Sequence, residues 1–301
     1  MVRGVCWLAV LGLVWAAGAG RAQETYAIKL KEGGKGQRHK VEKRSAQKFA
    51  IALAGAQGNP VPAQDEATTE RFVYEETILE RPDPAKKPTR LRRRYEVAQV
   101  KKGGDARTLP YEGKTVDIRK ADGRYRFRVE GGGELAGQDA EALDREFNKR
   151  TGEDFDFNKA MLPKKPVRVA ETWKPDTAAL VADLQKQAPV EIDAARAKAT
   201  ATLVKAYKKD GRQFGVIKMT LDFPLKGLRQ GGKLVPFGAG QRLTIVATMD
   251  GCIDGSLLDG GAAFTGRMAA QFDLDLAGQK LKVSAKMSME GEEKDKELGP
   301  K

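Results

Sequence analysis

Long runs of strict alternation between apolar and polar residues most constrain how this chain folds. In residues 262–276 the apolar positions share one parity, and after Ala277 and Gly278 the alternation resumes through residue 289. These apolar positions are Phe264, Met268, Phe272, Leu274, Leu276, Leu281, Val283, Ala285, Met287 and Met289. Because successive side chains of a β-strand point to opposite faces, the runs predict an antiparallel hairpin with one apolar face and one wet face.

The same period of two recurs in both halves of the chain. Further alternating runs centre on Ile28, Val41, Phe72, Leu91, Phe127, Ala201, Ile217 and Ile245. Asp-Gly pairs at residues 122, 210 and 259 predict turns between such runs. We therefore predict a mainly β fold, α+β in detail, with antiparallel meanders over 23–135 and 190–290 that form either one curved sheet or two.

Between the meanders the pattern changes to that of helices. Leu143 and Phe147 are four residues apart and predict a short helix over 138–150, and a second helix is predicted over 176–188 with Asp176 as its N-cap. Residues 136–189 are thus expected to form a helical connector. Glycine and proline predict loops at 55–64, 81–87 and 227–240, and the charged residues 291–301 are expected to be a frayed tail.

The first 22 residues have the pattern of a secretory signal peptide. Arg3 precedes an apolar run from Val5 to Gly20, which ends in small residues before Ala22. The run is shorter than the ~20 apolar residues that span a bilayer, so cleavage after Ala22 is expected. Cleavage removes two of the 54 basic residues and none of the 41 acidic ones, which leaves a net charge of +11. We expect export to the periplasm or the extracellular space, with no transmembrane segment in the mature chain.

The sequence offers few residues for catalysis or metal binding. His39 is the only histidine, and Cys252 is the only cysteine outside the predicted signal peptide. A catalytic triad, a Cys- or His-rich zinc site and an internal disulfide are therefore excluded. Cys252 is expected to be a buried, small apolar side chain, and Ser256 lacks the glycine pattern of a nucleophile elbow. We expect no cofactor and no metal.

Paired carboxylates leave one enzymatic alternative open. Asp154 with Asp156, and Asp273 with Asp275, are two residues apart. A glycan-active hydrolase needs only two acids. Residues two apart on a strand also share one face, so the simplest interpretation of both pairs is a solvated face.

Two rows of arginines are the main candidates for binding. They are Arg90, Arg92 and Arg94 in one predicted strand and Arg124, Arg126 and Arg128 in another. If both strands lie in one sheet, the rows form a cationic surface for an acidic envelope polysaccharide or for anionic lipid headgroups. A solvated face balanced by Glu96 and Glu130 is the alternative. Nucleic acid is not expected as a partner, because the aromatic residues alternate with the arginines and point the other way.

One tryptophan is the remaining candidate. Trp173 lies between Pro166 and Pro175 and is either a ligand contact or a hydrophobic plug over a sheet edge. The segment from Leu162 to Trp173 resembles a segment of uncharacterised secreted proteins of planctomycete-type bacteria, whose pattern has glycine in place of Ala170. The resemblance implies an exported protein and supplies no catalytic residue.

These observations favour a non-catalytic exported protein that binds an envelope component or a hydrophobic ligand between the sheet and the connector helices. A carboxylate-only glycan-active hydrolase and a purely structural envelope protein are the alternatives. A hydrolase would have two acids facing each other across a cleft, whereas a structural protein would have a filled core. The sequence does not indicate an oligomeric state.

Overall fold

The computed structural model describes residues 24–55, 60–84, 86–149, 156–276 and 279–299. The predicted signal peptide, residues 1–22, lies outside them. The strands of the N-terminal half are β1 (Thr25–Tyr26), β2 (Arg38–Gly55), β3 (Pro60–Glu80), β4 (Arg90–Lys102), β5 (Asp105–Thr108), β6 (Thr115–Ala121) and β7 (Arg124–Val129). The later strands are β8 (Val167–Arg168), β9 (Thr172–Trp173), β10 (Val190–Ile192), β11 (Lys198–Lys209), β12 (Arg212–Gln230), β13 (Lys233–Pro236), β14 (Arg242–Cys252), β15 (Asp259–Leu276) and β16 (Gln279–Leu298).

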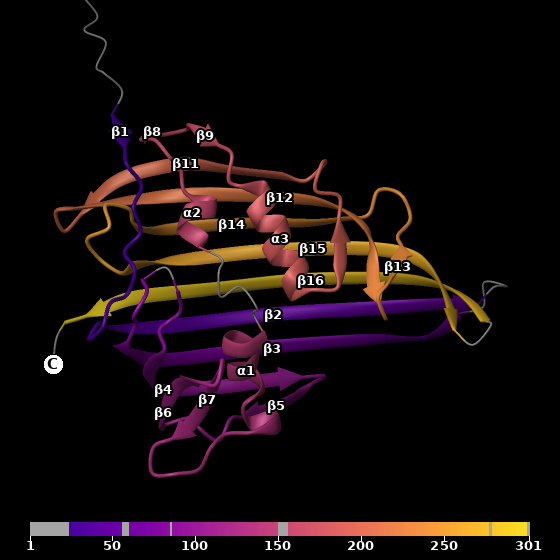
Figure 1. Ribbon diagram of the computed structural model, residues 1–301, viewed down its shortest axis with the longest axis horizontal. Coiled ribbons are helices and arrows are strands. Elements are labelled where there is room, and N and C mark those ends of the chain that lie inside the picture. The colour runs from indigo at the N-terminus through magenta and orange to yellow at the C-terminus, as the bar shows by residue number, and fades with distance from the viewer. Residues whose placement is uncertain (1–23, 56–59, 85, 150–155, 277–278, 300–301) are drawn as a thin grey trace, which may run out of the picture.

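Both meanders belong to one antiparallel sheet. Over the described residues it has 14 strands, whose main path is β7-β6-β4-β3-β2-β16-β15-β14-β12-β11-β9, while β5, β10 and β13 pair beside that path (Figure 1). The meanders join where β2 pairs with β16, from Arg38 opposite Leu298 to Gly55 opposite Leu281. The predicted mainly β, antiparallel fold with a few short helices in the connector is therefore confirmed.

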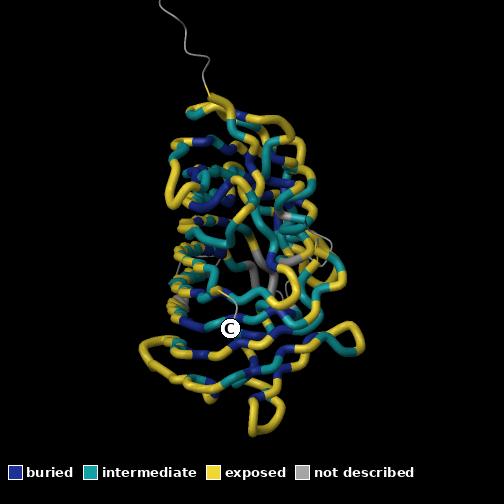
Figure 2. Tube along the Cα trace, turned by 90° about the vertical axis from the view of Figure 1, so that its left-hand side faces the viewer, coloured by how far each residue is buried: buried dark blue, intermediate teal, exposed yellow. Residues whose placement is uncertain are grey.

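The apolar alternation defines one face of the sheet, here called the inner face. Register places Phe49 beside Met287 and Met287 beside Met268, so residues of the same face continue from strand to strand. Figure 2 shows buried and exposed positions alternating along the strands. Figure 1 looks onto the inner face, where the helices lie in front of the sheet.

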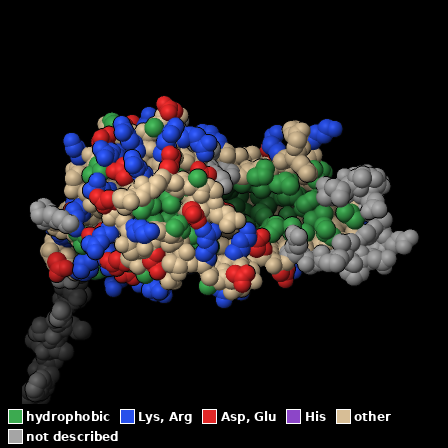
Figure 3. Space-filling view, turned by 90° about the horizontal axis from the view of Figure 1, so that it is seen from below, with side chains coloured by type: hydrophobic (Ala, Val, Ile, Leu, Met, Phe, Trp, Pro, Cys, Tyr) green, Lys and Arg blue, Asp and Glu red, His purple; other side chains and the backbone are tan. Residues whose placement is uncertain are grey.

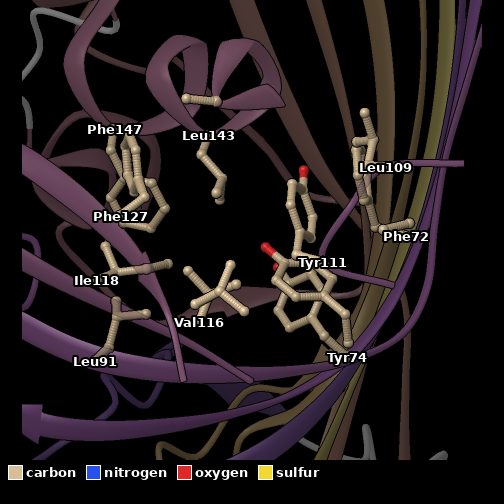
Figure 4. Packing of buried hydrophobic residues seen from close by; sticks show 14 of the residues in the cluster. Phe72, Tyr74, Leu91, Leu109, Tyr111, Val116, Ile118, Phe127, Leu143 and Phe147 are labelled. Carbon is tan, nitrogen blue, oxygen red and sulfur yellow. The ribbon is translucent and has the colours of Figure 1, made fainter. Parts of the chain in front are cut away.

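The connector helices cover the two ends of the inner face. The 3-10 turn η1 (Gly137–Asp139), helix α1 (Glu141–Asp144) and the π turn η2 (Arg145–Lys149) lie over β4, β6 and β7, where Leu143 and Phe147 pack on Ile118 and Phe127 (Figure 4). Helix α3 (Thr177–Gln187) lies over the other end, where Val181 packs with Phe223 and Leu243. Among the described residues, none of the helices is long and apolar enough to cross a membrane.

The predicted helix ends agree closely with the structure, although one helix was missed. The Asp176 carboxylate accepts a hydrogen bond from the Ala179 N–H, which confirms it as the N-cap of α3. Helix α2 (Phe157–Met161) was not predicted, because five residues are too few to show a helical period. Its N-cap is Asp156, whose carboxylate accepts from the Lys159 N–H.

Several predicted turns and loops are instead parts of strands. Turns at Asp122 and Asp210 are confirmed by their left-handed φ angles of 52° and 50°, but Asp259 begins β15. Part of the loop predicted over 55–64 belongs to β3, which begins at Pro60, and the one over 227–240 contains the hairpin of β12 and β13. Glycine and proline lie near the ends of these two local hairpins, where the strands continue to pair, with a register shift between Ile51 and Leu53 in the first.

The tail predicted to fray beyond residue 290 is a strand through Leu298. Its alternating charges meet partners from other segments: Glu293 lies 3.7 Å from Lys43, and Glu297 lies 2.8 Å from Lys31. A run of charged residues does not by itself predict disorder, because here cross-strand ion pairs continue the strand. Cys252 is buried, as predicted.

Candidate functional site

The middle of the inner face is hollowed beside α1, while on its other side Met268 packs against the cluster that contains Val181 of α3. There β2, β16 and β15 present a run of mostly half-buried apolar side chains, which we call the apolar trough. Its floor residues are Phe49, Ile51, Leu53, Met268, Phe272, Val283, Ala285 and Met287. Figure 3 shows a hollow lined by hydrophobic side chains in this part of the molecule. Farther along β15, Phe264 is 37% exposed on the same face.

Two walls enclose this floor. On one side, a cavity of about 720 Å³ lies between the floor residues Phe49 and Met287 and the wall residues Leu109 and Ala142. On the other side, the segment after β13 closes onto β15, where the rings of Phe237 and Phe272 have centroids 5.3 Å apart. The trough therefore has an apolar floor between a wall of β5 and α1 and a wall of α3 and β13.

Charged side chains along the first wall are paired. Lys102 lies 2.8 Å from Glu66 across β4 and β3. Arg145 of η2 pairs with Glu70, and Arg107 pairs with Asp139. Because each cation has an anion beside it, this wall has little net charge, and the apolar floor is its main feature for recognition.

A second cavity of about 370 Å³ lies next to the first. The two share the lining residues Gln47, Glu70, Ala142 and Arg145. Beyond this boundary the second cavity is lined by the aromatic and charged side chains of Tyr74, Arg93, Tyr95, Tyr111, Glu146, Lys43 and Glu293. We call it the polar cavity.

A buried arginine organises the wall of the polar cavity. Arg93 is 5% exposed, and its guanidinium donates to Glu76 at 2.7 Å and to both carboxylate oxygens of Glu146 at 2.7 and 3.1 Å. The same group lies over the rings of Tyr74 and Phe147, 4.3 and 4.9 Å from their centroids. This arrangement satisfies a charge that would be costly to bury alone.

Two more titratable groups extend this cluster toward β16. His39 Nε2 lies 3.6 Å from Glu76 and 4.0 Å from Asp295. Burial, together with the charges of Glu293 and Glu76, raises the pKa of Asp295 to about 7. Burial lowers the pKa of His39 although Glu76 opposes this effect. The cluster therefore favours the uncharged forms of both groups near neutral pH.

The predicted acid pairs do not form a described cleft. Asp156 caps α2, and Asp273 is exposed on the outer face of β15. Asp154 and the side chain of Asp275 lie outside the described residues. Over the described part of the chain, no group of three or more His, Cys, Asp or Glu side chains is arranged to hold a metal ion.

The structure brings the two predicted arginine rows onto one face, opposite the inner face. Strand β6 lies between them and adds Arg119, which register places between Arg90 and Arg126. Acids accompany the rows: Asp117 lies 3.2 Å from Arg90 and 4.0 Å from Arg92, and Asp122 lies 3.5 Å from Arg126. The resulting arginine surface comprises Arg90, Arg92, Arg94, Arg119, Arg124, Arg126 and Arg128.

Trp173 is not part of that surface. It lies on β9 at the opposite edge of the sheet, and its Nε1–H donates to the Met161 carbonyl at 2.8 Å. Its ring packs against the core cluster that includes Leu203 and Ile217. The candidates chosen from sequence therefore occupy two separate places, and neither is in the apolar trough.

Comparison with known proteins adds no family. No family model matches the chain, and no curated protein matches it. Among solved structures, an outer membrane channel from Pseudomonas putida F1 covers 90% of this chain and 98% of its own at 10% identity, with a TM-score of 0.22. A FadL homologue from Pseudomonas aeruginosa covers 86% and 90% at 8% identity, with a TM-score of 0.17. The MucA/MucB complex of the same species covers 80% and 88% at 13% identity, also with a TM-score of 0.17. Scores this low carry no argument about this chain.

Proposed function

We propose that this protein is exported and binds a long apolar ligand, such as an acyl chain, in the apolar trough without catalysing a reaction. The observation that carries the proposal is the uncovered apolar floor between two walls. Ligand sites are typically concave and mostly apolar, with few polar groups. The predicted signal peptide supports a place outside the cytoplasm.

The floor differs from the covered end of the same face, where Ile118 and Phe127 are buried. Each square ångström of apolar surface removed from water contributes roughly 25 cal/mol of favourable free energy. A ligand that covers this open floor of large side chains would therefore gain binding free energy from their burial. From Phe49 to Leu53 the strand advances by roughly 13 Å. A floor that continues along paired strands fits a linear ligand better than a compact one.

Binding of a fluorescent fatty acid tests the proposal. Residues 23–301, freed of bound lipid, should increase the emission of a fatty acid that carries the fluorophore at its chain end. Met287→Glu places a carboxylate in the floor and should weaken binding at least about tenfold, because an unpaired charge in apolar surroundings is costly. Ser288→Glu adds the same charge on the outer face, next along the strand, and should bind as the wild type does.

The outcome that would overturn the proposal is equally specific. If the wild type does not bind the fatty acid, or if Met287→Glu and Ser288→Glu bind it equally, the trough is not a ligand site. As a control, far-ultraviolet circular dichroism should show that both variants retain the β-fold.

A second proposed binding surface is the arginine surface, with an acidic polysaccharide as its partner. The supporting observation is that Arg119 completes a line of three guanidinium groups across neighbouring strands, spaced by about 4.8 Å per strand. A line of cations suits a polymer with repeating phosphate, sulfate or carboxylate groups, and such pairing weakens as salt rises.

Charge reversal tests this surface. The double change Arg92→Glu and Arg126→Glu should abolish low-salt binding to heparin, used as a sulfated probe. Lys198→Glu with Lys208→Glu, on exposed positions of β11, is the matched control and should retain binding. Binding that survives the arginine changes would leave these residues as a solvated face, and binding only to vesicles with anionic lipids would assign the surface to a membrane instead.

A further inference from the structure

The polar cavity contains a hydroxyl group without a protein partner. Tyr111 is 0% exposed, and within the described residues its hydroxyl forms no hydrogen bond. Figure 4 shows its ring between Leu109 and Leu143. A buried hydroxyl that lacks a partner destabilises the folded state, so such groups are rare unless something else binds them.

This hydroxyl is placed to meet a ligand. Tyr111 lines the polar cavity, and its ring centroid is 4.7 Å from that of Tyr95, which fixes its position. The cavity adjoins the apolar trough at the Arg145 and Glu70 ion pair. Arg145 is 46% exposed, and an ion pair this exposed contributes little to stability, so a ligand can displace it at small cost.

The charges of the polar cavity indicate which head group fits there. Its inward-facing cations already have anionic partners: Lys43 lies 3.7 Å from Glu293, Arg93 lies 2.7 Å from Glu146, and Arg145 pairs with Glu70. A second anion would therefore meet carboxylates without gaining a cation. Burial raises the pKa of Tyr111, so the phenol stays protonated and can donate.

We propose that the polar cavity receives the neutral, hydrogen-bonding head of an esterified lipid whose acyl chain lies in the apolar trough, and that Tyr111 donates to its ester or hydroxyl oxygen. The inference rests on the proposed function and specifies its ligand class. It assigns preference for the head group to Tyr111 and affinity for the chain to the trough.

Competition experiments test this assignment. The fluorescent fatty acid is displaced from the wild type by 1-monopalmitoylglycerol or by palmitate at pH 7.4, and the glyceride should be the stronger competitor. Tyr111→Phe removes only the hydroxyl and should weaken the glyceride about tenfold while leaving palmitate unchanged. Because the hydroxyl has no protein partner, this variant should fold as the wild type does.

Tyr125→Phe is the matched control. Tyr125 belongs to the same core cluster, but its hydroxyl donates to the Pro88 carbonyl at 3.0 Å and it does not line the polar cavity. This variant should lose some stability and keep the preference for the glyceride. If palmitate competes as well as the glyceride, or if Tyr111→Phe keeps the preference, the head-group assignment is wrong. If the fluorescent fatty acid does not bind the wild type at all, the proposed function fails as well.

Discussion

The covered end of the inner face and its open middle are built from the same kind of sequence but differ in what lies above them. At the covered end, Ile118 and Phe127 are sealed by Leu143 and Phe147. In the middle, Phe49 and Met287 occupy equivalent inward positions and stay half-buried. Alternation therefore decides which face a side chain joins, whereas the path of the connector decides whether that face is closed.

The connector leaves the middle open because its described helices go to opposite ends. The segment η1-α1-η2 packs over β4, β6 and β7, and α3 packs over β12 and β14. The buried Arg93 ties η2 to the sheet through Glu146. If the trough is a binding site, changes at the covered end should mainly affect stability and changes in the middle should mainly affect binding.

The largest loss of stability is expected for Arg93→Leu. The leucine keeps most of the volume but leaves Glu76 and Glu146 beside each other without their shared cation. Breaking a buried ion pair in this way costs about 3–5 kcal/mol, which urea unfolding would measure. Arg92→Leu, exposed on the outer face next to it, should change stability by less than about 1 kcal/mol. Equal losses would mean that the buried network does not hold the covered end together.

Leu143→Ala should have the next largest effect. Leu143 is 1% exposed between α1 and the sheet, so truncation leaves a cavity that the surroundings fill only in part. Such changes cost about 2–5 kcal/mol of unfolding free energy. The affinity for the fluorescent fatty acid, measured well below the denaturation temperature, should change less than the stability does, because Leu143 lines the polar cavity and not the floor of the trough. A loss of affinity as large as that expected for Met287→Glu would show that the covered end and the trough are not separate.

An effect that depends on pH is expected for Asp295→Asn. The folded pKa of Asp295, about 7, lies above its usual value of 3.8. The protonated form is thus favoured by folding, and the stability it contributes is complete below about pH 4 and is lost as pH rises through 7. Asparagine stays neutral, so the stability of the variant relative to the wild type should be greater at pH 8 than at pH 4.5. Urea unfolding at both values measures this, and parallel curves would contradict it.

Much of the fold follows from the sequence because strand alternation is a local signal. The sequence alone predicted which residues around Met287 face inward and that Asp176 is an N-cap. The sequence could not predict which strands pair. Strand β2 pairs with β16 across more than two hundred residues, and no local pattern specifies that pairing. The strand beyond residue 290 was missed because its charged residues lack an apolar alternation, although it continues the hairpin with β15 and pairs with β2 on its other side.

The candidate site was harder to predict from the sequence than the fold was, although one pattern in the sequence indicated it. Arg93 and Glu76 each occupy an inward parity between apolar neighbours, and His39 precedes Val41 in the same phase; charged residues in an apolar phase indicate a buried network. The arginine rows predicted from the sequence were instead the outward ones on either side of Arg93. Tyr111 follows a loop outside any alternating run, so only the fold shows that its hydroxyl lies in a cavity.

The smallest loss of stability is expected for Met287→Ala, the counterpart in the trough of Leu143→Ala. Met287 is half-buried and borders open space, so truncation enlarges the trough rather than creating a sealed cavity, and the cost should be below about 1 kcal/mol.

The effect of Met287→Ala on binding should be larger, because the methionine side chain forms part of the surface that covers the ligand. A saturating fatty acid stabilises the folded state in proportion to the logarithm of its concentration over Kd, so it should raise the melting temperature of Leu143→Ala more than that of Met287→Ala. If the ligand stabilises both variants equally, Met287 does not contact it; if Met287→Ala loses as much stability as Leu143→Ala, the middle of the inner face is a closed core and not a trough.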